Sequence, residues 1–92
     1  MRLRWTQLAA QDLTHICDFI TEHGGPTAAR GAALAIFEEV SVLAQFPEAG
    51  RTGRKHDTRE LVIARFPYVV IYRLRNENVE VLRILHSSQK WP

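Results

Sequence analysis

The sequence of 92 residues contains one cysteine, Cys17, and one methionine, and no stretch of it is both long and apolar. A lone cysteine excludes an internal disulfide and is typical of a reducing compartment, so we expect a cytoplasmic protein. No segment approaches the ~20 apolar residues of a membrane span, and the first residues carry no apolar targeting core. His15 and His23 have no partners at the spacing of metal ligands. We therefore expect no metal, no cofactor and no membrane association.

The composition is that of an ordinary soluble globular domain, with 46% hydrophobic and 24% charged residues. A chain of this size buries roughly 60–65% of its unfolded surface, so we expect one domain spanning residues 1–92. Charge is unevenly placed: residues 1–50 hold three basic and six acidic residues, whereas residues 51–92 hold nine basic and four acidic residues. This asymmetry favours a polyanion or an acidic protein as partner of the C-terminal half. The alternative is that some arginines are solvated charges that protect strand edges.

Two amphipathic helices are predicted in the first half of the chain. Thr6 is suited to cap the first helix, and Gly24-Gly25 ends it. Its apolar stripe at helical spacing consists of Ala9, Leu13, Ile16, Cys17 and Ile20. The second helix runs from about Pro26 to Gln45, and Phe46-Pro47 ends it. Its stripe consists of Ala29, Ala33, Ile36, Phe37, Val40, Leu43 and Ala44. The short connection predicts an antiparallel helical hairpin.

Strands are predicted at the two ends of the chain. Val, Ile, Leu and Tyr are frequent there, Pro67 marks a break, and Asn76-Glu77-Asn78 suits a tight hairpin loop. The predicted strands are Met1–Trp5, Arg59–Phe66, Tyr68–Arg75 and Val79–Leu85. The order β-αα-βββ predicts an α+β fold, with the helical hairpin packed on one face of a small antiparallel sheet.

Strand alternation divides the last two strands into two faces, if Arg75 lies opposite Val79. One face is then almost entirely apolar and suits a core: Tyr68, Val70, Tyr72, Leu74, Leu82 and Ile84. The other mixes aliphatic residues with arginine: Val69, Ile71, Arg73, Arg75, Val79, Val81, Arg83 and Leu85. We expect the second face to be a surface for an anionic or amphipathic partner.

The segment Glu48–Asp57 combines flexible glycines with positive charge. Gly50 and Gly53 loosen its backbone, and its basic residues are Arg51, Arg54, Lys55 and His56. The spacing of glycine, lysine and hydroxyl residues is not that of a Walker loop. Either a phosphate-contacting loop or a mobile solvated connection fits this composition.

Several short motifs follow one another along the chain: Trp5, Ala9–Leu13 with Ile16, Phe46-Pro47 with Gly50-Arg51, Arg59–Leu61, Pro67-Tyr68, Ile71–Arg73 and His86–Pro92. Together they resemble the RelE/ParE superfamily, the toxins of bacterial type II toxin–antitoxin pairs, over essentially the whole chain. The resemblance implies the same β-αα-βββ fold and a role in growth inhibition or plasmid stabilization. It also implies a small antitoxin, encoded nearby, that wraps the toxin in a hetero-oligomer.

The resemblance implies one of two activities. RelE-like members cleave mRNA in the ribosomal A site, and ParE-like members inhibit DNA gyrase and block replication. RelE-like enzymes carry an arginine just after the tyrosine that opens the third strand, whereas Val69 follows Tyr68 here. They also place basic or tyrosine residues after the last strand, where this chain has Ser87–Gln89. These departures favour a ParE-like gyrase inhibitor, with a ribosome-dependent mRNA endonuclease as the alternative.

Cleavage of RNA through its 2′-OH needs a base, an acid and cations for the developing negative charge. His86 is the candidate acid or base, and the candidate cations are Arg65, Arg73 and Arg83. This set is not the one that the resemblance implies for the ribonuclease, so whether the protein is an enzyme stays open. The candidates for contact with a target or the antitoxin are Arg51, Arg54, Lys55, Arg59, Arg65, Arg73, Arg83, His86 and Lys90.

Some of these side chains also have plain structural interpretations. His86 is predicted to pack at a strand end against Tyr68, and Tyr72 to be a core aromatic like Tyr68. Trp91-Pro92 is predicted to close the edge of the core.

Overall fold

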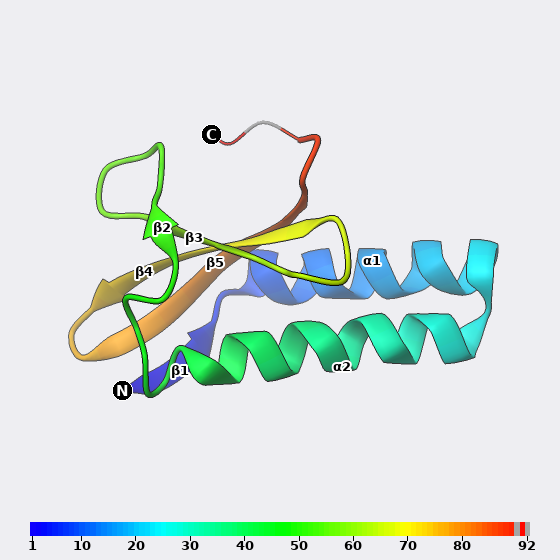
Figure 1. The fold of residues 1–92 in the computed structure, drawn as a ribbon, viewed down its shortest axis with the longest axis horizontal. Coiled ribbons are helices and arrows are strands. Elements are labelled where there is room, and N and C mark those ends of the chain that lie inside the picture. Colours follow the sequence, from blue (N-terminus) through cyan, green and yellow to red (C-terminus); the bar gives the residue numbers. More distant parts are fainter. Residues whose placement is uncertain (90, 92) are drawn as a thin grey trace.

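The computed structural model describes residues 1–89 and 91. Its elements are β1 (Arg2–Trp5), α1 (Gln7–Gly24), α2 (Pro26–Val42), β2 (Arg51–Thr52), β3 (Arg59–Val62), β4 (Tyr68–Arg75) and β5 (Asn78–His86). The predicted α+β fold and the order of its helices and long strands are confirmed (Figure 1). The short strand β2 was not predicted, and it turns part of the basic segment 48–57 into sheet.

The helices begin and end largely where their capping residues indicated. The Thr6 hydroxyl accepts a hydrogen bond from the Ala9 N–H at 3.1 Å, and Gly25 breaks the chain between the helices with a φ of 89°. Pro26 then occupies the first turn of α2, as predicted. α2 ends at Val42, three residues earlier than predicted, because residues 43–45 form a tighter turn with bonds from each N–H to the carbonyl three residues back.

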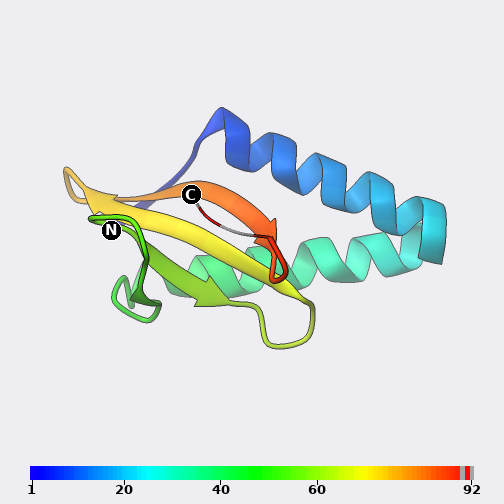
Figure 2. The same ribbon diagram turned by 90° about the horizontal axis from the view of Figure 1, so that it is seen from above.

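The five strands form one sheet in the order β1-β5-β4-β3-β2. β1 runs parallel to β5, whereas the other neighbours are antiparallel, so the sheet is mixed and the prediction of an antiparallel sheet is corrected. Both helices lie on one side of this sheet, and the β2–β3 loop and residues 87–89 lie on the other (Figure 1). The helical hairpin extends well beyond the sheet at its α1–α2 turn (Figure 2).

The register of the β4–β5 hairpin differs from the prediction next to its loop. Arg75 pairs with Asn78, not Val79, because Asn76 and Glu77 alone form the loop, with φ values of 52° and 63°. A bulge between Ile71 and Tyr72 then absorbs one residue of β5, and beyond it the predicted pairing holds.

This register moves three side chains to the other face of the sheet. Val79 and Val81 were predicted on the arginine-bearing face, but they are completely buried against the helices. Leu82, predicted in the core, is the residue absorbed by the bulge and is only partly buried.

The core lies between the helices and the apolar sheet face. Its fully buried large side chains include Tyr72, Ile36, Leu43, Val40, Val70, Val79 and Val81. Phe37 was predicted in the α2 stripe, but it is 47% exposed and packs beside Trp5, with ring centroids 5.4 Å apart. Ala32 takes the buried position on α2 instead. Neither α1 nor α2 combines the length and the apolar composition that a membrane crossing requires.

β3 is shorter than the predicted strand 59–66. It ends at Val62, and the chain then turns, so that the Ile63 N–H donates to the Tyr68 carbonyl at 3.0 Å. The Tyr68 N–H meanwhile donates to the Phe66 carbonyl at 2.7 Å. Pro67 cannot donate to a strand ladder, and the chain reverses in the four residues before it.

Candidate target-binding surface

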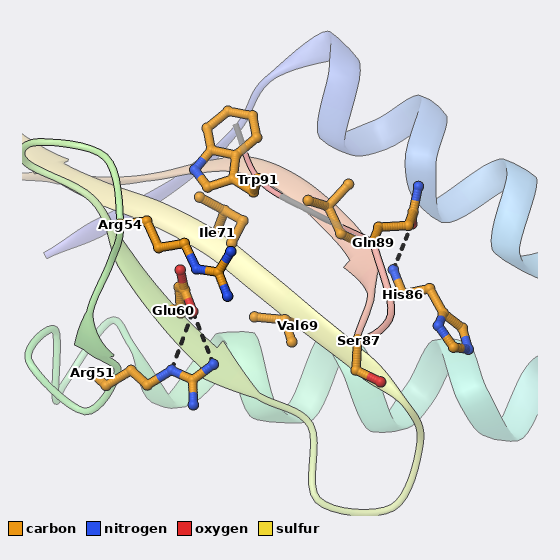
Figure 3. Close-up of a pocket in the computed structure, with 10 residues that line it drawn as sticks. Arg51, Arg54, Glu60, Val69, Ile71, His86, Ser87, Gln89 and Trp91 are labelled. Atoms are coloured by element: carbon orange, nitrogen blue, oxygen red, sulfur yellow. Dashed lines mark hydrogen bonds and ion pairs between the residues drawn. The ribbon is translucent and has the colours of Figure 1, made fainter.

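The sheet face turned away from the helices, called the open face below, is aliphatic at its centre. Val69 and Ile71 of β4 lie beside Leu85 of β5, as the predicted alternation required. They line a small pocket of about 50 Å³ together with Arg51, Arg54, Glu60, His86, Ser87, Gln89 and Trp91 (Figure 3). The pocket brings together three of the predicted site residues: Arg51, Arg54 and His86.

Arg51 is fixed at the rim of the open face by an ion pair. Its Nε and Nη2 both donate to the same carboxylate oxygen of Glu60, at 3.1 and 2.9 Å (Figure 3). The Glu60 side chain is 9% exposed, whereas that of Arg51 is 64% exposed. The pair therefore holds a cation toward solvent in a set direction, and it contributes little to stability because solvent screens it.

The loop that carries Arg51 and Arg54 is anchored in the core by Tyr72. The buried Tyr72 hydroxyl donates to the Pro47 carbonyl at 2.7 Å and accepts from the Gly50 N–H at 2.8 Å. Burial raises the pKa of this phenol above its ordinary value. Gly50 has to lack a side chain, because a Cβ there would lie 2.7 Å from the Tyr72 ring.

Arg59 takes part in the same anchor. It donates to the Gly50 carbonyl at 2.7 Å and to the Glu48 carbonyl at 3.3 Å. Its position on β3 puts it on the helix side of the sheet, paired with Tyr72. The structure thus separates Arg59 from the open face.

Arg73 and Arg83 are both engaged in ion pairs within the chain. Arg73 Nε donates to Glu80 at 2.6 Å. Arg83 reaches around the edge of β5 to Asp12 of α1, with contacts of 2.7 and 3.0 Å, and these hydrogen bonds raise the pKa of the guanidinium. Asp12 also accepts from the backbone N–H of Ile84 at 2.9 Å. Both arginines therefore stabilise the sheet and its junction with α1.

His86 ends β5 at the border of the open face. Its ring lies edge-on against Tyr68 with centroids 5.8 Å apart, which confirms the predicted packing. Its Nδ1 lies 2.7 Å from the Ser88 hydroxyl, and its backbone N–H donates to Gln89 Oε1 at 2.7 Å. The imidazole is exposed, so it is accessible to a partner.

Trp91 lies on the open face and not at the edge of the core, where it was predicted. It lines the pocket with Ile71 and Leu85, which are only 2% and 6% exposed. Lys55 of the β2–β3 loop lies over its indole ring, 5.6 Å from the centroid. The aliphatic centre of the open face is therefore partly covered by the chain itself. Lys90 and Pro92, named in the predictions, lie outside the described residues.

Arg65 lies in a different concavity from His86. Together with Ile63 it faces Glu38, Glu39, Ala35 and Val42 of α2. Its guanidinium lies 6.0 Å from the Phe66 ring centroid. Of the set considered for RNA cleavage, Arg83 and His86 line one groove beside α1, whereas Arg65 lies apart from both.

A larger groove lies between α1 and the end of the β4–β5 hairpin. It measures about 560 Å³, and its apolar lining consists of Ile16, Phe19, Pro67, Tyr68, Ile84 and Leu85. Phe19 is 52% exposed, so a large apolar side chain lies uncovered at its rim. Within residues 1–89 and 91, no cluster of three His, Cys, Asp or Glu residues offers a metal site.

Sequence reasoning missed the roles of Asp12 and Glu60. Both are acidic residues whose partners lie far away in sequence or on another strand, and their sequence neighbours give no sign of the pairing. Asp12 belongs to one of the motifs behind the family resemblance, but the sequence alone assigns it no partner. Its bonds to β5 are the physical reason for an acid at this position.

Comparison with known proteins agrees with this geometry. Residues 3–91 match the family described as ParE toxin of type II toxin–antitoxin system, parDE. The chain is 42% identical over 91 residues to the candidate toxin Y4kP of Sinorhizobium fredii, covering 99% of this chain and 93% of that protein. It is 38% identical to toxin RelE2 of Caulobacter vibrioides, covering 92% and 93%. A solved structure of the chromosomal ParDE system from P. aeruginosa superimposes with a TM-score of 0.87 at 33% identity, covering 94% of this chain and 95% of that one.

Proposed function

Because this chain belongs to the ParE toxin family of type II toxin–antitoxin systems, we propose that it inhibits DNA gyrase by binding and is neutralised by a cognate antitoxin. The proposed target surface is the open face with the β2–β3 loop. Arg51, Arg54 and Lys55 supply its outward positive charge.

The observation that carries the proposal is the chemistry at the centre of the open face. Val69 is partly exposed beside the buried side chains of Ile71 and Leu85, and cations stand at the rim of this small aliphatic patch. Such a surface can bury apolar area and attract an acidic partner, which are the two needs of a stable protein–protein contact. Val69 occupies the position where the RelE-like pattern has a guanidinium.

Catalysis by this surface would need more titratable groups than it holds. Strand cleavage through the 2′-OH requires one group to take a proton and another to give one. Among the described residues that line the pocket, His86 is the one imidazole, and the one carboxylate, Glu60, is bound to Arg51. A binding function needs neither proton transfer nor a second base.

One observation favours a second candidate, a RelE-like mRNA endonuclease. The same pocket gathers Arg51, Arg54 and His86, so a phosphate there would have two cations and one acid or base within a single concavity. The relative named toxin RelE2 is compatible with this alternative.

The two functions are separated by assays on the purified toxin freed from its antitoxin. We expect it to inhibit supercoiling of relaxed plasmid by the host gyrase and to leave mRNA intact on programmed ribosomes. In cells, induction should cause filamentation and an SOS response before translation stops. Cleavage of A-site codons with unimpaired supercoiling would refute the gyrase proposal.

A pair of charge variants tests the surface itself. Arg54→Glu should weaken gyrase inhibition at least about tenfold, since it reverses a cation at the rim of the open face. Arg30→Glu, on the exposed part of α2, is the matched control and should retain inhibition. Equal inhibition by both variants would exclude the open face as the contact.

His86→Gln distinguishes binding from catalysis at the same pocket. Loss of a general acid or base costs about 10²–10⁴-fold in rate, whereas loss of one exposed contact costs far less. We expect inhibition to change by less than about tenfold. A loss beyond about 100-fold would favour the endonuclease.

The groove between α1 and the β4–β5 hairpin is the proposed site of an antitoxin helix. Its apolar lining and the exposed Phe19 suit the apolar face of an amphipathic helix. Phe19→Glu should abolish co-purification of the product of the neighbouring gene. Phe37→Glu, an equally exposed phenylalanine outside the groove, is the control and should leave co-purification intact.

A further inference from the structure

The strand edges on the β1 side of this sheet are protected. The outer edge of β1 carries the exposed charges of Arg2 and Arg4. Beyond the end of β1, the edge of β5 is covered by α1: the Thr6 hydroxyl donates to the Leu82 carbonyl at 3.0 Å, and Asp12 accepts from Ile84. Charged side chains and covering elements are the usual means of preventing an edge from pairing with another chain.

The edge of β3 has neither form of protection at Val62. β2 is two residues long and pairs only with Arg59 and Glu60, so the rest of β3 has no neighbour on that side. Glu60 pairs with Arg51 on β2, and Ile63 donates to Tyr68 on β4. Because backbone groups alternate in direction along a strand, the N–H and C=O of Val62 point outward, away from β4.

A cleft with two glutamates and one arginine in its lining lies beneath this free edge, between β3 and α2. It measures about 280 Å³ and is lined by Ala35, Glu38, Glu39, Val42, Ile63 and Arg65. Val42 on its floor is 46% exposed, and Val62 on the other face of the sheet is 50% exposed. No described residue forms an ion pair with Glu38 or Glu39. A strand added at this edge would cover both valines, since its alternate side chains would point to the two faces.

We propose that an extended segment of the antitoxin pairs with β3 at Val62 and places a lysine or arginine in the cleft opposite Glu38 and Glu39. The proposal rests on the proposed function, because it assumes the antitoxin, and it adds where and how one of its segments is held. Backbone hydrogen bonds at Val62 fix the register of the segment, and the two glutamates select its charge. A small aliphatic side chain beside that cation would fill the space over Val42.

Amide exchange at Val62 tests the pairing directly. In the free toxin, the Val62 N–H points to solvent and should exchange rapidly, whereas Leu61 and Ile63 are bonded to β4 and should exchange slowly. In the complex with the product of the neighbouring gene, exchange at Val62 should slow by at least about tenfold relative to Leu61 and Ile63. Saturation is verified by gel filtration of the same sample.

Two substitutions with matched controls test the backbone and the charge separately. Val62→Pro removes the outward N–H but leaves the hydrogen bonds to β4 in place, so it should weaken the complex at least about tenfold. Val62→Thr is the control: it keeps the outward N–H and should bind the antitoxin with unchanged affinity. Glu38→Lys should weaken the complex similarly and make its affinity less sensitive to salt. Glu77→Lys, in the β4–β5 loop, is the charge-matched control and should bind as the parent chain does.

Each outcome bears on the proposal. Slower exchange at Val62 in the complex, with weaker binding by Glu38→Lys, supports it. A saturated complex in which Val62 still exchanges rapidly overturns it, while the antitoxin assignment stands. Failure to form any complex overturns both. Protection of Val62 that grows with the concentration of the toxin alone overturns it too, because a second copy would then occupy the edge.

Discussion

Removal of one hydroxyl group should test whether the core holds the basic loop in place. Tyr72→Phe deletes the oxygen that donates to Pro47 and accepts from Gly50, and both contacts are buried or nearly so. Two hydrogen bonds contribute about 1 kcal/mol each, and a buried N–H left without a partner costs about 1 kcal/mol or more. We therefore expect the free energy of unfolding to fall by about 2–3 kcal/mol. For a domain of this size that corresponds to a decrease in Tm of about 10–20 °C.

Tyr68→Phe is the matched control for this substitution. Tyr68 is also a largely buried tyrosine of β4, at 8% exposure, but no hydrogen bond of its hydroxyl occurs among the described residues. Removal of the Tyr68 hydroxyl should lower the free energy of unfolding by less than about 0.5 kcal/mol. Urea titration followed by circular dichroism gives both values, with equal slopes if only the folded state is affected.

The same pair of variants links stability to function. If Tyr72 anchors the loop that carries Arg51 and Arg54, gyrase inhibition by Tyr72→Phe should fall at a temperature where the variant is still folded. Tyr68→Phe should inhibit normally. A Tyr72→Phe protein as stable as its Tyr68→Phe counterpart would refute the assigned anchor, whatever its activity.

Three further predictions concern the pH response, the junction with α1 and the tight glycine. Burial raises the pKa of Tyr72, so the folded state favours the neutral phenol. The contribution of this group to the free energy of unfolding should therefore persist below pH ~10 and decline above it. Denaturation midpoints measured at increasing pH would show the decline. Asp12→Ala leaves Arg83 and the Ile84 N–H without their acceptor, and should lower the free energy of unfolding by about 2 kcal/mol. Asp12→Asn should cause a smaller loss. Equal, negligible losses for both variants would contradict a stabilising role of Asp12 between α1 and β5. Gly50→Ala should destabilise by about 1–3 kcal/mol, because its Cβ would meet the Tyr72 ring, whereas Gly31→Ala, in open space within α2, should stabilise by about 0.5–1 kcal/mol in the same melts.

Periodicity was sufficient to predict the helices and the long strands. The stripes of α1 and α2 and the alternation of β4 recur over many residues, so one exceptional residue such as Phe37 does not obscure them. β2 has only two residues, too few for any period, and the partner of its Arg51 is Glu60, which lies nine positions further along. The parallel placement of β1 likewise depends on the path of two helices and could not be read from five residues.

The register of the hairpin could not be predicted because two irregularities offset each other. A two-residue loop shifts β5 by one position relative to the predicted three-residue loop, and the bulge at Leu82 shifts it back. The predicted pairing is therefore right for Val70 with Ile84 and wrong for the residues next to the loop. No local pattern marked the bulge, since the residues around it alternate without a glycine or a proline.

The candidate site changed most where charges found partners within the chain. From sequence, Arg73 and Arg83 were candidates for contact with a target, yet they are bound to acids of β5 and α1. Arginines already paired and partly desolvated gain little from a new acidic partner, because the partner would have to replace an existing ion pair. Arg54 and Lys55 have no ion pair with any described residue. Around the pocket of the open face, the positive charge available to a target therefore includes Arg54 of the β2–β3 loop, and reversal of charge at Arg54 should impair gyrase inhibition more than reversal at Arg73 in variants of equal stability.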